Sequence, residues 1–572
     1  MKTFQHFNRS SSDCCENSET LCSGQHYDFV VLNFGNHVEF AAHAVEQWKR
    51  VKEEFGFVSA YLGYSPDSVI TSPWDGSEEE YSQSYYWKTY LDIPFFSETV
   101  GASKWTRLKT LLKANCTTAI SLCRATIFAA TRGNNGFFQS IRCQRVRGLS
   151  IGPAVLSDYL RRDYLRGYSG YLKLDREFVK IMYVCHRYLH YWLDVCPQQN
   201  FSRVLFSCPE TTYRDEIARQ ALLSRGAKEI FMQRWSESKF AVWSTHREGW
   251  ELNVAYPDAL HVKPDDVAKA REQMAMRLSG NLNYVYMSTD VSNKPVMDQN
   301  SRNQTGRPQA VIYLHLVSDA QHANGPDCFN DLHHWLRASI KMLSQLGFRI
   351  FLKLHPLNVS PRLPGDTHYK AYLENWLGVG WDRLTFGQVL PSRHAEVYLV
   401  DYRVPIKAMC ELLGSFLCVT HHGVIATEAT AAGVPAVISS AGPYRYFPRF
   451  AYIYDSISQY EELLKRYAQG QMKVTPEMES NLYYYLASTK GDFNKWLWIA
   501  FGEMSGRPYF SDPELTYRFF RQISNDDDVP EPLRVGFGGT RPVINIDGVD
   551  RVRCDAVGSP AFPPIAPSFP PE

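Results

Sequence analysis

Short, unbroken apolar runs alternate along the chain with stretches in which apolar residues recur every three or four positions. Residues 28–34 (DFVVLNF) form such a run, residues 39–56 have helical periodicity, and residues 57–65 form the next run. Unbroken β-branched runs are typical of strands covered on both faces, whereas the 3.6-residue repeat indicates an amphipathic helix. The chain therefore opens with a β-α-β unit, which predicts a parallel sheet.

The same alternation returns further along the chain. Strands are expected at residues 202–208, 228–235, 311–317, 348–353, 396–401, 415–420 and 435–439. Helices are expected at residues 174–194, 211–226 and 332–347. A polar stretch containing Gly and Pro, residues 290–308, separates two groups of these elements. The pattern predicts an α/β fold with two Rossmann-like domains on parallel sheets that face each other across a cleft.

The 572-residue length also favours two domains, because it exceeds what one core usually serves. The bounds follow from the changes in pattern. We expect a loose tail at 1–25, an N-terminal Rossmann-like domain at 26–290, a linker at 291–308, a C-terminal Rossmann-like domain at 309–470, helices that pack back across the domains at 471–523, and a disordered Pro-rich tail at 524–572.

Charge and cysteine usage narrow the class of protein. The net charge is only +1, so no global electrostatic attraction to nucleic acid is expected. One local basic stretch, residues 104–115, is either a solvated helix face or an acceptor- or membrane-surface helix. The 13 Cys lack CxxC pairs, and no apolar leader or run of ~18 apolar residues is present. A cytoplasmic protein with reduced thiols is expected, with peripheral membrane contact left open.

Two predicted strands end on histidine. Lys353 and His355 follow one strand, and residues 420–423 (Thr420, His421, His422 and Gly423) follow another. Ligands of open parallel sheets bind at the carboxyl ends of the strands, and helix starts there favour phosphate. Glu428 lies one to two turns into the following helix, where a carboxylate suits a ribose diol, although a plain surface position explains it equally well.

Three further loops carry candidate chemistry. Asp319 and His322 follow the strand at 311–317, where they suit acid–base or sugar-hydroxyl contacts, or simple loop capping by Asp319. His37 follows the first strand and is either a base or an exposed helix-start residue. The stretch 145–167 carries Arg147 and Asp158 and either presents cations to an anionic sugar or forms a structural hairpin and helix start. A metal site on His315, His322, His333 and His334 is discounted because the specific ligand spacings are absent.

At these residues the sequence resembles the capsule and surface-polysaccharide glycosyltransferases of bacteria, which have the GT-B architecture. The segment KLHP (353–356) resembles the Lys-x-His-Pro motif of that family, which recurs in bacterial sialyltransferases and Kdo transferases. Residues 419–437 resemble the donor loop, and residues 315–336 resemble the strand–Asp–His loop with the Trp helix that follows. Residues 147–162 and 211–226 resemble segments of the N-terminal domain, and the likeness spans roughly 145–450.

The resemblance implies a metal-independent glycosyltransferase with the acceptor on the first domain and the nucleotide-sugar on the second. His355 would contact the donor phosphate, and the loop from His421 through Thr427 to Glu428 would hold phosphate and ribose. The acceptor would be a capsule or other surface glycan or a glycolipid, and a CMP-sugar is the favoured donor. No cofactor is expected beyond this co-substrate. The general base is Asp319 or His37, with Asp158 as a further candidate. Two alternatives remain: a sugar-nucleotide epimerase or hydrolase, and a non-catalytic partner of a polysaccharide assembly complex.

Overall fold

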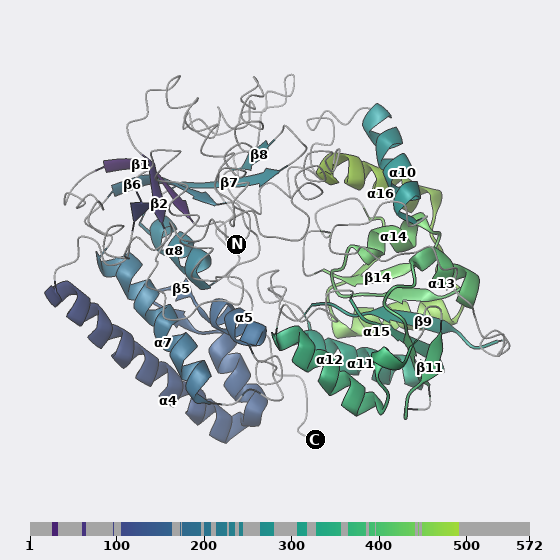
Figure 1. Ribbon diagram of the computed structural model, residues 1–572, viewed down its shortest axis with the longest axis horizontal. Coiled ribbons are helices and arrows are strands. Elements are labelled where there is room, and N and C mark those ends of the chain that lie inside the picture. The colour runs from purple at the N-terminus through teal and green to yellow at the C-terminus, as the bar shows by residue number, and fades with distance from the viewer. Residues whose placement is uncertain are drawn as a thin grey trace, which may run out of the picture.

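The chain folds into two α/β lobes, each built on a mostly parallel sheet (Figure 1). The computed structural model describes residues 26–32, 60–63, 95–96, 104–162, 172, 174–195, 200–206, 213–225, 228–234, 240–243, 264–278, 306–316, 328–355, 364–384, 388–394, 396–440, 444 and 449–490. The expected fold class, α/β with two Rossmann-like sheets, is confirmed. The expected tails at 1–25 and 524–572 lie outside the described residues.

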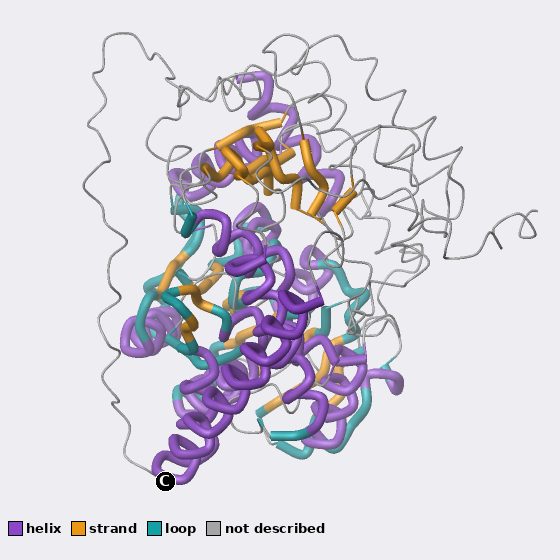
Figure 2. Tube along the Cα trace, turned by 90° about the vertical axis from the view of Figure 1, so that its left-hand side faces the viewer, coloured by secondary structure: helices purple, strands orange, loops and turns teal. Residues whose placement is uncertain are grey.

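The N-terminal sheet has six strands in the order β3-β2-β1-β6-β7-β8. Its strands are β1 (His26–Leu32), β2 (Ala60–Gly63), β3 (Phe95–Phe96), β6 (Asn200–Phe206), β7 (Lys228–Arg234) and β8 (Phe240–Trp243). All neighbours are parallel except β7 and β8. The strands expected from the apolar runs in this part of the chain are therefore confirmed, and Figure 2 shows them gathered at the top of its view above a layer of helices.

Helices of the N-terminal lobe form a separate core beside this sheet. The elements are α4 (Lys104–Arg142), a hairpin of β4 (Arg145–Val146) and β5 (Leu149–Ser150), α5 (Gly152–Arg162), α7 (Arg176–His190) with a π-helical turn at Tyr191–Val195, and α8 (Tyr213–Leu223). Phe138, Tyr159, Phe178 and Trp192 are buried in this core, which fixes α5 and α7 side by side.

The C-terminal sheet has seven strands in the order β11-β12-β10-β9-β13-β14-β15. They are β9 (Gln309–Tyr313), β10 (Arg349–Lys353), β11 (Val389–Pro391), β12 (Val397–Val400), β13 (Leu417–Val419), β14 (Ala436–Ser439) and β15 (Tyr452–Tyr454). Only the edge strand β11 is antiparallel to its neighbour. Five strands were predicted in this block: those at 348–353, 396–401, 415–420 and 435–439 are present, and the one at 311–317 is found as β9, which begins at Gln309 and ends at Tyr313.

Helices cover both faces of the C-terminal sheet, as continuous apolar strands require. The helical segments are α10 (Pro264–Leu278), α11 (Leu332–Gln345), α12 (Pro364–Leu377), a 3₁₀ turn (Trp381–Arg383), α13 (Ile406–Leu413), α14 (Ile425–Ala431), α15 (Ile457–Ala468) and α16 (Pro476–Lys490). Ile350 and Leu352 share a core with Trp335 of α11, whereas Phe351 shares the opposite core with Met409 of α13. Alternate residues of one strand thus face opposite helix layers.

The two lobes touch through the end of α4 and the helix α5. Gln139 donates to Asn330 at 2.6 Å, and Asn330 donates to Asn135 at 2.9 Å. Leu160 of α5 is buried within the apolar core of the C-terminal lobe. The helix α10 falls within the predicted N-terminal domain, yet it packs against α14 and α16 of the other lobe, as Figure 1 also shows.

Candidate functional site

Polar side chains stand at the carboxyl ends of four adjacent parallel strands in the C-terminal sheet. The strand order β12-β10-β9-β13 brings together Asp401, Lys353, His315 and Thr420, each at or just beyond the end of its strand. This edge of a parallel sheet is where ligands bind in open α/β folds. The two strands that were expected to end on histidine, β10 and β13, lie on either side of β9.

His315 is the centre of this cluster. Its Nε2 accepts the backbone N–H of His421 at 3.1 Å and that of His422 at 3.3 Å, and it lies 2.9 Å from Oγ1 of Thr420. A backbone amide can only donate, so Nε2 carries no proton and the ring proton resides on Nδ1. Burial, together with His422, His421 and His355, holds the pKa of His315 well below its ordinary value. The ring is therefore neutral and serves as the acceptor that shapes the loop after β13.

Contacts among four aromatic rings fix the orientation of that loop. The rings of His315 and His422 stack with centroids 4.4 Å apart, and Trp335 meets His421 edge-on at 5.7 Å. The Nδ1 atoms of His421 and His422 are 2.7 Å apart, so one donates to the other. Nε2 of His422 is buried and has no hydrogen-bond partner among the described residues. Burial and the neighbouring His421 lower the pKa of His422 to about 3, so this ring too is neutral at pH 7.

Position 423 of this loop has no room for a side chain. A Cβ on Gly423 would lie 2.8 Å from Cε1 of His315 and 2.8 Å from Oγ1 of Thr420. Such distances are closer than real Cβ atoms approach other heavy atoms. The residue is therefore a glycine because the imidazole of His315 occupies the space where a side chain would start.

Lys353 brings a buried positive charge to the same edge. Its side chain is only 8% exposed, and its Nζ lies 5.4 Å from the ring centroid of Tyr313 on the neighbouring strand. Burial lowers the pKa of Lys353 to about 8, against the opposing effects of Glu428 and Asp401. Its ammonium makes no hydrogen bond or ion pair with any residue that the structure describes. A buried ammonium is stabilised by a partner of negative charge.

His355 follows Lys353 by two positions and is mostly buried. Burial and the charge of Lys353 lower the pKa of His355 to about 4. The imidazole is therefore neutral at pH 7, and it acts as a hydrogen-bond donor or acceptor rather than as a cation. His355 also adds to the electrostatic field that keeps His315 neutral.

Each carboxylate near Lys353 has an arginine of its own. Glu428 pairs with Arg277 of α10, whose Nε lies 2.6 Å and whose Nη2 lies 2.5 Å from Oε1. Asp401 pairs with Arg403, which donates its backbone N–H at 2.9 Å. The two carboxylates therefore affect Lys353 by longer-range electrostatic attraction. They leave its ammonium available to another partner.

The remaining predicted residues lie elsewhere or are already engaged. Thr427 is buried in α14 and its hydroxyl donates to the carbonyl of Val424 at 2.7 Å. Arg147 sits in the turn between β4 and β5 with φ 52° and pairs with Asp194 at 2.7 Å. Asp158 lies within α5, and its side chain is not described. His37, Asp319 and His322 lie outside the described residues.

Sequence reasoning missed three members of this cluster. His315 was considered only as a metal ligand, and Asp401 and Arg277 were not considered. The sequence signal for His315 is its place at the end of an apolar strand, the same signal that pointed to His355 and His421. Its companions in the discounted metal set lie apart from it: His333 is buried on α11 beside Tyr372, and His334 lies against Phe329. In the described part of the chain no group of three or more His, Cys, Asp or Glu is placed to hold a metal.

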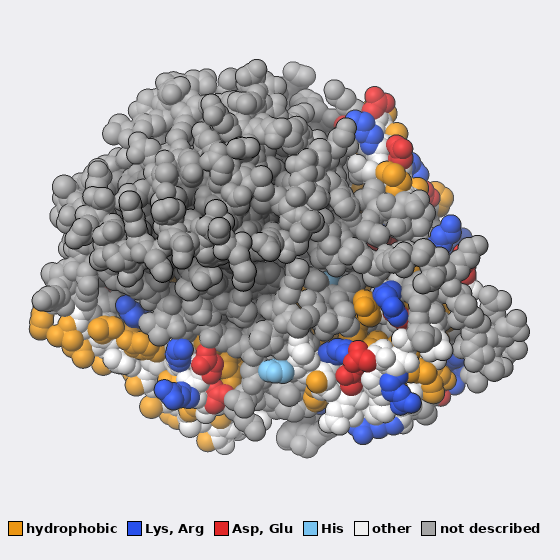
Figure 3. All heavy atoms as spheres, in the orientation of Figure 1, with side chains coloured by type: hydrophobic (Ala, Val, Ile, Leu, Met, Phe, Trp, Pro, Cys, Tyr) orange, Lys and Arg blue, Asp and Glu red, His pale blue; other side chains and the backbone are white. Residues whose placement is uncertain are grey.

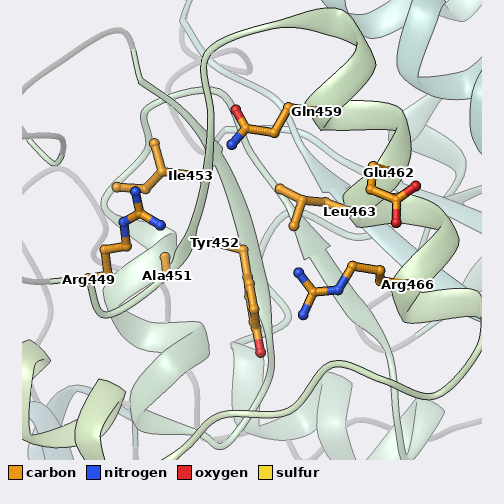
Figure 4. Close-up of a pocket in the computed structure, with 8 residues that line it drawn as sticks. All are labelled: Arg449, Ala451, Tyr452, Ile453, Gln459, Glu462, Leu463 and Arg466. Atoms are coloured by element: carbon orange, nitrogen blue, oxygen red, sulfur yellow. The ribbon is translucent and has the colours of Figure 1, made fainter.

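A separate small pocket lies on the outer side of the C-terminal lobe, between β15 and α15 (Figure 4). Its volume is about 290 Å³, and it is lined by Arg449, Ala451, Tyr452, Ile453, Gln459, Glu462, Leu463 and Arg466. The guanidinium of Arg466 lies over the ring of Tyr452, 5.9 Å from its centroid. None of the residues at the strand ends lines this pocket.

No protein-family model and no curated protein matches this chain. Among solved structures, KpsC of Thermosulfurimonas dismutans, a β-Kdo 2,4 transferase, matches 52% of this chain and 85% of its own at 10% identity and a TM-score of 0.28. HepE of Anabaena, solved with UDP-glucose, matches 87% and 98% at 11% identity and a TM-score of 0.25. The apo structure of OtsA matches 84% and 99% at 12% identity and a TM-score of 0.27. With TM-scores this low, the fold and the site are judged from the chain's own strands and side chains.

Proposed function

We propose that this protein is a glycosyltransferase that moves a sugar from a nucleotide-sugar donor to a glycan or glycolipid acceptor. The observation that carries the proposal is Lys353, a buried ammonium without a hydrogen-bond or ion-pair partner among the described residues. It stands at the carboxyl end of β10, two residues before His355 and beside β9, which leads to His315. The Lys-x-His-Pro motif that contains it resembles that of the surface-polysaccharide transferases.

The chemistry of the cluster suits a phosphate group of the donor. Lys353 supplies the positive charge, and the neutral His355 supplies a hydrogen bond without adding a second buried charge. In the transfer step an acceptor hydroxyl oxygen forms a bond to the anomeric carbon as the bond from that carbon to the phosphate oxygen breaks. The leaving nucleotide keeps the electron pair, and its growing negative charge is stabilised by Lys353.

The hydroxyl proton needs a base, and the candidates remain those named from the sequence, Asp319 or His37, with Asp158 as a third. For the donor we favour a CMP-sugar, on the resemblance of KLHP to the motif of sialyl and Kdo transferases. Glu428 is proposed to bind ribose through Oε2, because both contacts with Arg277 go to Oε1.

The test is a panel of thermal-shift measurements with CMP, UDP, GDP and ADP and their sugars, on the wild type and on His355→Ala. A ligand that binds only the folded state raises its apparent stability, by about 2.7 kcal/mol at a hundredfold excess over Kd. We expect one nucleotide to stabilise the wild type and to stabilise the variant much less. If no nucleotide stabilises folded wild type, the non-catalytic assembly partner becomes the better explanation. Turnover of the sugar-nucleotide without any acceptor would instead favour the epimerase or hydrolase.

A further inference from the structure

Before its kink at Gly133, the long helix α4 exposes large apolar residues and buries small and polar ones, unlike an ordinary surface helix. After the kink, Phe137, Phe138 and Ile141 are buried in the usual way. The side packed on α7 carries small and polar residues, Thr110, Ala114, Thr118 and Ala125, all of which are buried. The large apolar residues point outward instead: Trp105 is 72% exposed, Leu108 45%, Leu112 55%, Ile120 68% and Ile127 64%. A helix of a water-soluble domain normally turns such residues toward the core.

Hydrogen bonds fix this orientation of α4. Thr118 Oγ1 lies 2.8 Å from Nδ1 of His186 on α7, and the Nε2 of Gln144 lies 3.0 Å from the other ring nitrogen. Lys113 donates to Asp194 at 2.8 Å, which adds an ion pair on the same side. Burial and the neighbouring His190 lower the pKa of His186 to about 3, so its ring stays neutral inside the contact. Turning α4 to bury its apolar residues would break all of these contacts.

The outward residues form one continuous line, which we call the α4 stripe. It comprises Trp105, Leu108, Leu112, Cys116, Ile120, Cys123 and Ile127, spaced by three or four positions. At 1.5 Å per residue it is ~33 Å long. It ends before Gly133, where φ is 63° and the helix kinks. Figure 1 places α4 on the outer edge of the N-terminal lobe, and Figure 3 shows hydrophobic atoms along that edge.

Charge on α4 is of a single sign. Lys109 and Arg124 are exposed beside the stripe, and residues 104–142 contain no Asp or Glu. The chain as a whole has a net charge of only +1, so this basic helix is a local feature. An apolar line flanked by cations matches the layer of anionic headgroups over acyl chains at the surface of a bilayer. No helix that the structure describes is long and apolar enough to cross a membrane.

We propose that the α4 stripe docks on the surface of an anionic lipid bilayer, with the helix axis in the plane of the membrane. The stripe enters the boundary between headgroups and acyl chains, while Lys109 and Arg124 meet the lipid phosphates. A bilayer fits better than a partner protein in one respect: the stripe is a long ridge on an outer edge of the lobe, and a ridge needs a deformable layer or a matching groove to cover it. The proposal does not depend on the transfer reaction, because the stripe is far along the chain from Lys353.

The test is co-sedimentation of the full chain with vesicles of phosphatidylcholine alone and of equimolar phosphatidylcholine and phosphatidylglycerol. Wild type should bind the anionic vesicles and should dissociate as salt rises. The double variant Ile120→Gln/Ile127→Gln should lose roughly tenfold in vesicle affinity, and Lys109→Gln/Arg124→Gln should lose affinity only for the anionic vesicles. Leu174→Gln is the control, because Leu174 is 49% exposed but lies outside α4.

Folding of the variants is checked by circular dichroism, and the substituted side chains are exposed, so the fold should survive. Failure of folded wild type to bind anionic vesicles would overturn the proposal. So would equal binding by wild type and by the Ile120→Gln/Ile127→Gln variant. Light scattering gives the remaining outcome: a wild-type dimer that the double variant dissociates, without vesicle binding, assigns the α4 stripe to a contact between two copies of the chain.

Discussion

Arg277 of α10 holds the carboxylate of Glu428 on α14, with two guanidinium nitrogens within 2.6 Å of the same oxygen. The side chains are only 14% and 18% exposed, so the pair is shielded from solvent. Through this contact a helix that precedes the C-terminal sheet in sequence fixes the residue after the loop of His421 and His422. A second pair, Arg271 with Glu479, joins α10 to α16 in the open, with exposures of 49% and 46%.

The two pairs give a matched test of what shielding contributes. Arg277→Gln leaves the carboxylate of Glu428 without its guanidinium, so we expect the free energy of unfolding to fall by about 1.5–3 kcal/mol. Arg271→Gln removes an exposed pair from the same helix and should cost less than about 1 kcal/mol. Urea unfolding of both variants measures the difference, and equal losses would show that the Arg277–Glu428 contact is not shielded as described.

Gly423→Ala tests the close approach of the loop to His315. The added Cβ would lie 2.8 Å from the imidazole, so the ring or the loop must move. We expect a loss of about 1–3 kcal/mol in stability and weaker binding of whichever nucleotide stabilises the wild type. Gly470→Ala is the control, because its φ of +72° adds strain in open space far from the cluster. If Gly423→Ala binds nucleotide as well as wild type does, His315 and the loop after β13 do not form part of the binding site.

The positions of most strands could be read from the sequence, because buried parallel strands need unbroken apolar runs. The runs at 202–208 and 348–353 correspond to β6 (Asn200–Phe206) and β10 (Arg349–Lys353). The start of α11 is also set locally, because Asp331 accepts the backbone N–H of His334 at 2.7 Å. Local chemistry of this kind depends on neighbours in sequence, and the sequence displays it directly.

The composition of the cluster depends on strand order, which the sequence does not display. His315 becomes central only because β9 lies between β10 and β13, although in sequence it precedes both. Arg277 reaches Glu428 across 151 positions, and no local pattern announces such a contact. The full length of α4 was hidden for a different reason. Before its kink at Gly133, large apolar residues of α4 face outward and its fully buried residues are Thr and Ala, so the usual core-facing periodicity is inverted there.

Lys353→Met should make the protein more stable and worse at binding phosphate. Burial lowers the pKa of Lys353 to about 8, so the charged ammonium destabilises the folded state at pH 7. Glu428 and Asp401 keep their own arginines, and the substitution leaves no buried carboxylate unpaired. We expect a gain of about 1–3 kcal/mol by urea unfolding, together with the loss of the nucleotide-induced thermal shift.

Lys370→Met is the matched control for that prediction, because it should lower the free energy of unfolding and not raise it. Lys370 donates to both oxygens of Asp382 at 2.8 Å and pairs with Glu374 at 3.3 Å, and these partners raise its pKa. Removing it should cost about 1 kcal/mol and leave nucleotide binding unchanged. A loss of stability in Lys353→Met as large as that in Lys370→Met would contradict the view that Lys353 lacks a partner in the free protein.

Stability should fall as the solution is acidified below about pH 6.5, because buried histidines must stay neutral in the folded state. Burial, with a smaller effect of a neighbouring cation, lowers the pKa of His355 to about 4 and that of His422 to about 3. Between these values and the ordinary 6.5 the unfolded chain binds protons that the folded chain excludes, so the free energy of unfolding decreases with falling pH.

Each of these histidines adds about 1.4 kcal/mol per pH unit to that slope in the window. Urea midpoints measured at steps between about pH 7 and pH 4.5 give the slope for wild type and for His355→Asn. Above about pH 7 the free energy of unfolding should depend on pH in the same way for both proteins. Below about pH 6 it should fall less steeply for the variant, by about 1.4 kcal/mol per pH unit, because one titrating histidine is missing. Identical slopes over the whole acid range would mean that His355 is protonated as readily in the folded chain as in the unfolded one. The ring would then add a positive charge beside Lys353 at mildly acidic pH. Affinity for the donor would rise on acidification, because two cations and not one would face its phosphate.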